Sequence, residues 1–233
     1  MKIRAIILSA LILCGISAVI MYSRAAQPQQ KSSVITQAIN DKNTPMVIKN
    51  LILKMKEQME VNDDQFPELI KEVENYTNSL ADSASVAVLH SMLAEMYQNY
   101  YQRNQWTINQ RTQLSGYIPE DIRVWTSNLF TDKIKEEIDL SLRPTALLQN
   151  TPVSKFKDIL EIGKDSQTLR PTLYEFLAFR ALDIQPTVQI YKDLIAFQNK
   201  EPNMKSVLLT ELDYLRFLYG DKRDKESFEA YMN

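Results

Sequence analysis

The stretch from Val86 to Arg111 constrains the fold of this chain more than any other. Nine of the twelve residues from Val86 to Tyr97 are apolar, and only His90, Ser91 and Glu95 interrupt them. The apolar side chains recur at helical spacing, and others widen the stripe on its flank. A helix with one solvent-exposed face has a narrower band of apolar residues than this one. The sequence therefore predicts a central helix that is covered on most of its circumference.

The beginning of the chain carries the pattern of an export signal. Lys2 and Arg4 precede an apolar run that ends at Met21, and the small residues Ser23 and Ala25 stand where a signal peptidase reads the chain. We therefore expect residues 1–25 to be a secretory signal peptide. This expectation predicts an exported protein of the periplasm or cell envelope.

Two alternatives to a cleaved signal stay open. The apolar run is close to the length of a membrane-spanning helix, so the segment could be an uncleaved membrane anchor. Cys14 could also be lipidated, although Leu13 is larger than the small residue that a lipoprotein signal places before its cysteine. The sequence predicts contact with a membrane only through such an anchor or lipid. All three alternatives lead out of the cytoplasm.

After signal removal the chain would have no cysteine and a modest negative charge. Cys14 is the only cysteine, so an exported domain without disulfides must rely on its core, which suits a bacterial envelope protein. Removing the first 25 residues takes away three basic residues and no acidic one. That leaves 24 basic against 29 acidic residues, a net charge of −5. Because this balance includes no basic stripe, we expect no nucleic-acid partner.

Proline placement and apolar periodicity predict an all-α protein. Prolines precede apolar-periodic segments, as first-turn prolines do, and no stretch alternates with the period of two that a strand requires. We expect a linker and short helix in residues 26–43, a single helical domain in residues 44–233, and roughly ten helices. Their ranges are Val34–Asn40, Pro45–Glu60, Pro67–Ser79, the central helix from Val86, Pro119–Leu142, Ser154–Ile162, Pro171–Ile184, Pro186–Asn199, Met204–Tyr219 and Lys225–Tyr231.

Both ends of the expected domain have the pattern of a helical hairpin. Short polar turns, Asp41–Thr44 and Asn199–Asn203, each join two helical segments. Stacked antiparallel helix pairs are the units of solenoid proteins. We therefore expect the hairpins to stack as a repeat-like array of the solenoid or tetratricopeptide (TPR-like) kind.

Residues suited to catalysis or metal binding are scarce. His90 is the only histidine, and without a second imidazole or a cysteine we expect it to be a hydrogen-bonded structural residue. The neighbours Glu136 and Glu137 point to different sides of a helix, so they do not form a convergent pair. Only Glu95, five residues from His90, hints at an enzyme. We expect no catalytic residue, no cofactor and no metal.

Aromatic and arginine residues near the end of the central helix suggest a structural motif. Such aromatic residues more often belong to a core than to a ligand platform, although a platform stays open. Four arginines lie nearby in sequence: Arg103, Arg111, Arg123 and Arg170. We expect at least one to be a half-buried anchor that ties the Trp106–Arg111 segment to a neighbouring helix by bidentate hydrogen bonds. The candidate motif consists of Tyr97, Tyr101, Trp106, Arg111, Trp125, Arg170, Pro171 and Tyr174.

Two runs of the sequence resemble a known family. The first, Leu93–Trp106, reads LAEMYQNYYQRNQW and continues to Gln110-Arg111-Thr112; the second, Arg170–Ala181, reads RPTLYEFLAFRA. Both are similar to the N-terminal helical region of very large bacterial alpha-2-macroglobulin-like envelope proteins. Pro119–Trp125 and Lys157–Leu160 fit the same region, and the resemblance extends from about Lys42 to the end in the family's order.

The resemblance has a limited functional implication. Members of that family trap proteases with a bait segment, and many use a Cys-Glx thioester, but these features belong to macroglobulin and thioester domains that would lie beyond Asn233. No inhibitory residue can therefore be assigned here. The resemblance implies a non-enzymatic exported helical module, a truncated or leading segment of such a protein. It would scaffold downstream macroglobulin domains of the same polypeptide or dock a protein partner.

The alternative is a stand-alone, TPR-like adaptor of the bacterial cell envelope that binds a protein partner. A row of exposed polar residues on one face of several successive helices would favour this alternative. An enzyme would instead need polar groups that converge in a pocket.

Overall fold

The computed structural model describes residues 44–61, 65–112, 116–160, 163, 165–200 and 203–220. The expected signal or anchor at residues 1–25, the linker and short helix at 26–43 and the helical turn at Lys225–Tyr231 lie outside the described residues. The chain divides after Leu53 into two compact units. The expectation of one helical domain at 44–233 stays a prediction.

The described residues are helical and contain no β-strand; an isolated bridge joins Pro152 to Thr172. The α-helices are α2 (Thr44–Val61), α3 (Phe66–Ser79), α4 (Ser83–Ile108), α5 (Ser127–Ser141), α6 (Thr145–Asn150), α7 (Ser166–Leu169), α8 (Leu173–Ile184), α9 (Val188–Gln198) and α10 (Met204–Tyr219), with two 3-10 turns, η2 (Ile122–Val124) and η3 (Val153–Phe156). The all-α prediction is confirmed. The expected number of roughly ten helices and the TPR-like stacking are not.

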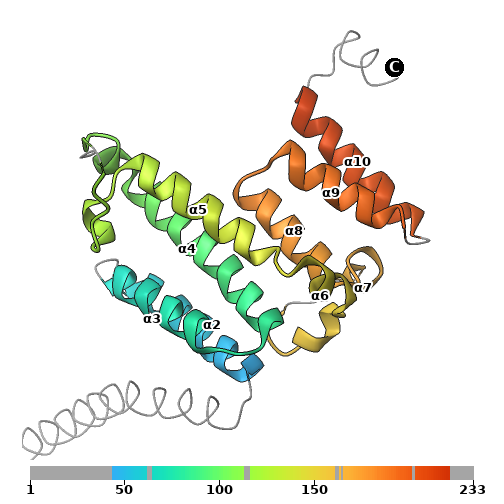
Figure 1. The fold of residues 1–233 in the computed structure, drawn as a ribbon, viewed down its shortest axis with the longest axis horizontal. Helices are drawn as coiled ribbons and strands as arrows, with labels where there is room; N and C mark the ends of the chain where they lie inside the picture. The colour runs from blue at the N-terminus through green and yellow to red at the C-terminus, as the bar shows by residue number, and fades with distance from the viewer. Residues whose placement is uncertain are drawn as a thin grey trace, which may run out of the picture. The chain divides into compact units, whose positions relative to one another are not determined.

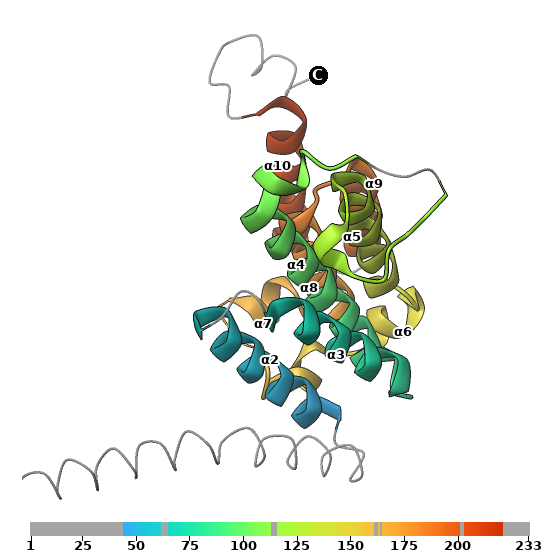
Figure 2. The ribbon, with the colours of Figure 1, turned by 90° about the vertical axis from the view of Figure 1, so that its left-hand side faces the viewer.

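Helix α4 is the central element of the second unit. It packs against α5, α3 and α8, and α5 lies along it in both views of the ribbon (Figures 1 and 2). Ala87, Leu89 and Leu93 on this helix are almost completely buried. The broad apolar stripe of the sequence is therefore covered from several sides, as expected for a central helix.

The C-terminal part of the second unit is built on α8. This helix packs against α4, α6 and α9, and α9 packs against α10, so the predicted C-terminal helical hairpin is present. A reciprocal capping box starts α8, in which the Thr172 hydroxyl accepts from the backbone N–H of Glu175 and the Glu175 carboxylate accepts from the backbone N–H of Thr172.

Helix α10 has several large apolar side chains that are exposed: Met204, Leu208, Leu209, Leu212, Phe217, Leu218 and Tyr219.

Two expected helices differ from the observed ones. The range Pro119–Leu142 is not one helix, because η2 and an extended segment precede α5. In this segment side chains form hydrogen bonds with backbone groups that a helix would otherwise pair. The Trp125 indole donates to the Pro119 carbonyl at 2.7 Å, and the Asp121 carboxylate accepts from the backbone N–H of Arg123 at 2.9 Å. The expected helix from Ser154 to Ile162 is replaced, within its described part, by the turn η3. The short helices α6 and α7 were not expected.

Candidate functional site

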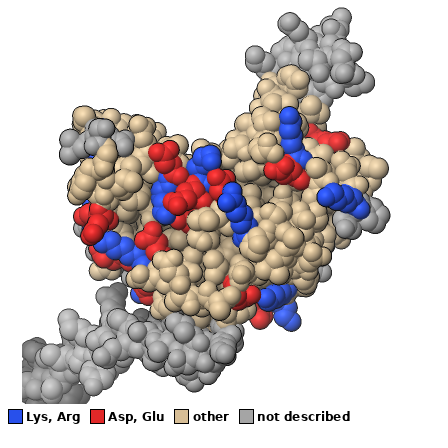
Figure 3. All heavy atoms as spheres, viewed as in Figure 1, with Lys and Arg blue, Asp and Glu red and all other residues tan. Residues whose placement is uncertain are grey.

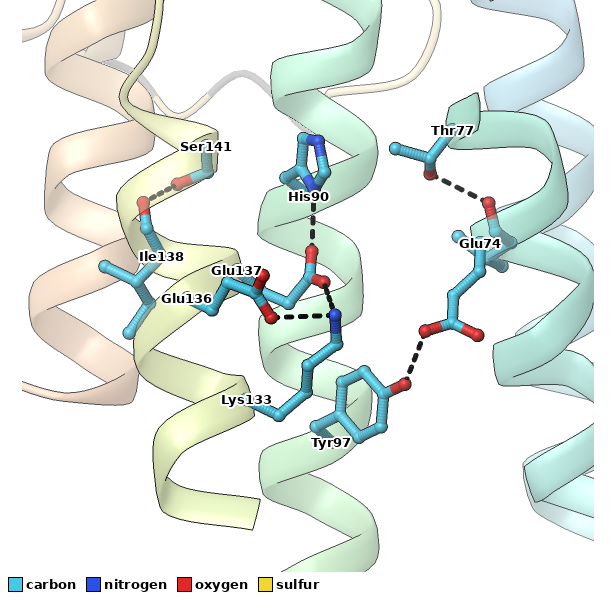
Figure 4. A network of polar contacts seen from close by, with 10 residues as sticks. Glu74, Thr77, His90, Tyr97, Lys133, Glu136, Glu137, Ile138 and Ser141 are labelled. Atoms are coloured by element: carbon cyan, nitrogen blue, oxygen red, sulfur yellow. Dashed lines mark hydrogen bonds and ion pairs between the residues drawn. The ribbon is translucent and has the colours of Figure 1, made fainter. Parts of the chain in front are cut away.

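A polar network around the buried Glu137 joins α4 to α5. The Glu137 side chain is only 3% exposed, and its two carboxylate oxygens have different partners. Nδ1 of His90 on α4 lies 2.7 Å from one oxygen, and Nζ of Lys133 lies 2.8 Å from the other. Lys133 also reaches Glu136 at 3.0 Å, and Figure 4 shows the three α5 side chains converging beneath His90. The predicted structural role of His90 is thus matched by a partner that holds its ring between two helices.

Burial and pairing act in opposite directions on the ionisation of this network. Burial opposes the charged form of Glu137, but hydrogen bonds from His90 and Lys133 outweigh it and hold the pKa of the carboxyl below its usual value. Burial likewise opposes the charge of Lys133, and its bonds to Glu137 and Glu136 still raise the pKa of the ammonium group. The ionised forms of Glu137 and Lys133 are therefore the stabilised ones.

Another polar contact shown in Figure 4 joins α4 to α3. The Tyr97 hydroxyl donates to the Glu74 carboxylate at 2.7 Å. Burial raises the pKa of Tyr97, and the bond to Glu74 raises it further. The phenol consequently remains a neutral donor, and its role is to fix the distance between two helices.

The two residues that hinted at an enzyme do not converge. His90 pairs with Glu137, whereas Glu95 pairs with Arg180 of α8 at 2.5 Å. Arg180 also donates from Nε to the hydroxyl of Ser91 at 2.9 Å. Among the described residues, no group of three or more histidine, cysteine or carboxylate side chains could hold a metal ion.

Part of the predicted motif forms an aromatic cluster around Phe130 of α5. Tyr97 and Trp125 are buried and stacked, with ring centroids 5.7 Å apart. Phe130 lies 5.3 Å from Trp125 and 5.9 Å from Tyr101. Such offset and tilted contacts are favourable for aromatic rings in a core. The prediction that these aromatics are core residues is confirmed for Tyr97 and Trp125.

Trp106 departs from the predicted motif. Its side chain is 78% exposed, so the expectation that it belongs to the core is wrong. Position 106 lies in the last turn of α4, where the helix carries other exposed positions on both sides of it. The position of Trp106 in the sequence did not indicate that its side chain would be exposed.

The arginine anchor is found in an altered form. Arg111 is half-buried, and its Nη1 donates to the Trp125 carbonyl at 2.7 Å, which ties the segment after α4 to the residues that precede α5. The acceptor is a single backbone carbonyl outside a helix, so the expected bidentate hydrogen bond to a neighbouring helix is not observed at Arg111. Arg123 bonds Glu68 of α3 and Asp121 of its own turn.

The remaining motif residues lie at the start of α8, away from that aromatic cluster. The Arg170 guanidinium stacks over the ring of Phe179 at 3.8 Å, and burial lowers the pKa of Arg170. Pro171 is exposed, and its carbonyl accepts from the Val153 amide. Tyr174 is buried and meets Phe197 of α9 edge-on at 5.2 Å. The structure therefore divides the predicted motif between two regions.

A groove lies beside Tyr174 in the described part of the chain. It has a volume of about 720 Å³ and runs between α5, α6, α8 and α9. Its apolar floor is formed by Ile138, Leu142, Tyr174, Ile190 and Phe197. Burial raises the pKa of Tyr174 to about 12, with Asp193 adding to the effect, so its hydroxyl stays protonated. A volume of this order is typical of ligand grooves.

The rim of this groove, here called the α5–α9 groove, is charged and rich in amides. Lys135, Asp139, Arg143, Asp193 and Lys200 line it, together with several glutamines. Charges of both signs are intermingled on the face of the molecule shown in Figure 3, with wide uncharged areas between them. Sequence reasoning missed the groove because its walls come from four helices. The one local signal was Tyr174, which the predicted motif contained.

The described residues form an all-α fold with an interhelical groove. No protein-family model, no curated protein and no solved structure matches the chain. None of the helices in the described part of the chain combines the length and apolar character that crossing a membrane requires.

Proposed function

We propose that this protein is a non-enzymatic helical interaction module of the cell envelope. Its α5–α9 groove binds an extended segment of a protein partner. The observation that carries the proposal is the groove itself: an open cavity of about 720 Å³ with an apolar floor and a polar rim drawn from several helices. Apolar contacts supply affinity in such a groove, and rim groups fix orientation.

The polar side chains that could have been catalytic are already paired with other residues, which also supports a binding role. His90, Glu95 and Lys133 are each paired with a residue of opposite potential charge in the described structure. A general base must be able to reach a substrate proton. His90 instead joins α4 to α5, and Glu95 joins α4 to α8, whereas Lys133 pairs within α5. Because α5 and α8 both line the groove, these contacts help to hold its walls in place.

The polypeptide context is a further part of the proposal. The resemblance at Leu93–Trp106 and Arg170–Ala181 supports a leading helical segment of an alpha-2-macroglobulin-like protein, where the module would also scaffold downstream domains. The alternative of a stand-alone envelope adaptor is supported by the α5–α9 groove, whose polar rim a separate protein could contact. Both alternatives assume export through the signal or anchor at residues 1–25.

The size and location of the native polypeptide test this context. An antibody against residues 42–233 is applied to fractionated cells. A band near 27.0 kDa, or slightly smaller, in the envelope fraction is expected for a stand-alone adaptor. A band many times larger is expected for a leading segment of a macroglobulin-like protein. A cytoplasmic band contradicts export.

The binding role is tested by photo-crosslinking in living cells. A photoreactive amino acid replaces Gln189, an exposed residue of α9 that lines the groove. The matched control carries it at Asn78, an exposed residue of α3 outside the groove. We expect an adduct from position 189 whose partner peptide is a single segment, and none from position 78. Equal adducts from both positions, or none from either, contradict the proposal.

A further inference from the structure

We propose that the segment bound in the α5–α9 groove is acidic, with a carboxylate held by Arg143 and Lys200. This inference rests on the proposed function and names the chemistry of the partner. It follows from the charges that line the groove, from the partners those charges already have, and from the apolar floor beneath them.

The basic groups of the rim are not equivalent. Lys135 is paired with Asp139, four residues along α5, at 2.8 Å. Arg143 and Lys200 line the same groove and are both exposed. Within the described residues, neither of these two side chains has an ion-pair partner. Two cationic groups are therefore available to an incoming anion, one on the segment after α5 and one on the segment after α9.

The acidic groups of the rim already have donors. Asp139 accepts from Lys135, and Asp193 accepts from the side-chain Nε2 of Gln189 at 2.9 Å. A ligand cation would have to compete with these contacts, whereas a ligand carboxylate meets the unpaired Arg143 and Lys200. The guanidinium group of Arg143 can bind a carboxylate in bidentate geometry. The charge pattern of the groove consequently favours an anion.

The floor favours a peptide over other anions. Ile138, Tyr174 and Phe197 present apolar and aromatic surface to the groove. Apolar side chains of a peptide can cover this surface, and their burial stabilises the complex. A polysaccharide anion would place hydrated hydroxyls there. We therefore assign the groove to acidic segments that also contain apolar residues.

The test measures the binding of short fluorescent peptides to the native chain purified from the cells that make it. One peptide alternates glutamate with leucine, a second has glutamine in place of every glutamate, and a third has lysine there. We expect the glutamate peptide to bind roughly tenfold more tightly than the glutamine peptide at low salt, and this preference to shrink as salt rises. An oligomer of galacturonate serves as an anion without apolar side chains.

The variants locate the effect in the groove. The double variant Arg143→Gln, Lys200→Gln is expected to bind the glutamate peptide roughly fivefold more weakly, with little change for the glutamine peptide. The control Lys157→Gln, Lys205→Gln removes the same charge from exposed positions outside the groove. It is expected to keep the preference. Thermal melting curves verify that all four substitutions, which are at exposed positions, leave the fold intact.

Several results would overturn the inference, and they are distinguishable from failure of the proposed function. The inference is wrong if the glutamine or lysine peptide binds as tightly as the glutamate peptide, if both double variants behave alike, or if the galacturonate oligomer binds more tightly than the glutamate peptide. The proposed function survives any of these results when position 189 still gives its specific crosslink. Absence of both the crosslink and peptide binding overturns the two together.

Discussion

Replacement of Phe130 by alanine is expected to lower the free energy of unfolding by about 3–5 kcal/mol. The side chain is fully buried, and its ring contacts those of Tyr97, Tyr100 and Trp125 at centroid distances of 6.5, 5.7 and 5.3 Å. Its removal would leave a cavity in the aromatic cluster that joins α4, α5 and the segment before α5. Rigid aromatic neighbours can fill such a cavity only in part.

Urea denaturation followed by circular dichroism measures this effect. The control Leu129→Ala places the same amino acid at the adjacent, half-exposed position of α5. Phe130→Leu keeps most of the apolar volume and is expected to cost less than half as much as Phe130→Ala. A cost at Phe130 no greater than that at Leu129 would show that the cluster does not hold the helices together.

The second large effect is expected at Glu137. Replacement by glutamine is expected to lower the free energy of unfolding at pH 7 by about 2–4 kcal/mol, because His90 and Lys133 lose the buried charge they face. The matched control Glu136→Gln changes an exposed neighbour on the same helix, which also binds Lys133. Its cost is expected to stay within about 1 kcal/mol. Equal costs at the two positions would contradict the assigned role of Glu137.

The cost at Glu137 is also expected to depend on pH. Because the folded state lowers the pKa of this carboxyl below the ordinary value of 4.5, the folded state binds fewer protons than the unfolded state in the acidic range. The stabilisation is therefore complete above pH 4.5 and is lost as the pH falls through the lower, folded-state pKa. We expect the stability difference between the native chain and Glu137→Gln to narrow in that window. A difference that stays constant would mean that the charge of Glu137 does not stabilise the fold.

Much of the helical architecture could be predicted because its signals are local. Met204–Tyr219 is the predicted and the observed extent of α10, and the apolar breadth of α4 predicted its central position. The prediction failed at Pro119–Leu142, where Ile122, Trp125 and Leu129 have helical spacing. There, a bond from Arg111 and the bond from the Trp125 indole hold the backbone in another form. A tertiary contact overrides local propensity in such a segment.

The candidate sites could be predicted only in fragments. Tyr97, Trp125 and Tyr174 were selected from the sequence, and all three are buried. The pairing of His90 with Glu137 joins residues 47 positions apart, and no spacing rule connects them. Trp106 was predicted to belong to the same motif, and its side chain is 78% exposed. The α5–α9 groove exists only because four helices meet.

The sequence by itself determined the helical class, the extent of most helices and the burial of α4. These properties depend on periodicity and capping over one or a few turns, which any short window of sequence contains. Only the tertiary structure decided which charges pair, which aromatic rings stack and where a groove stays open. These properties depend on side chains from distant segments, and packing alone brings them together.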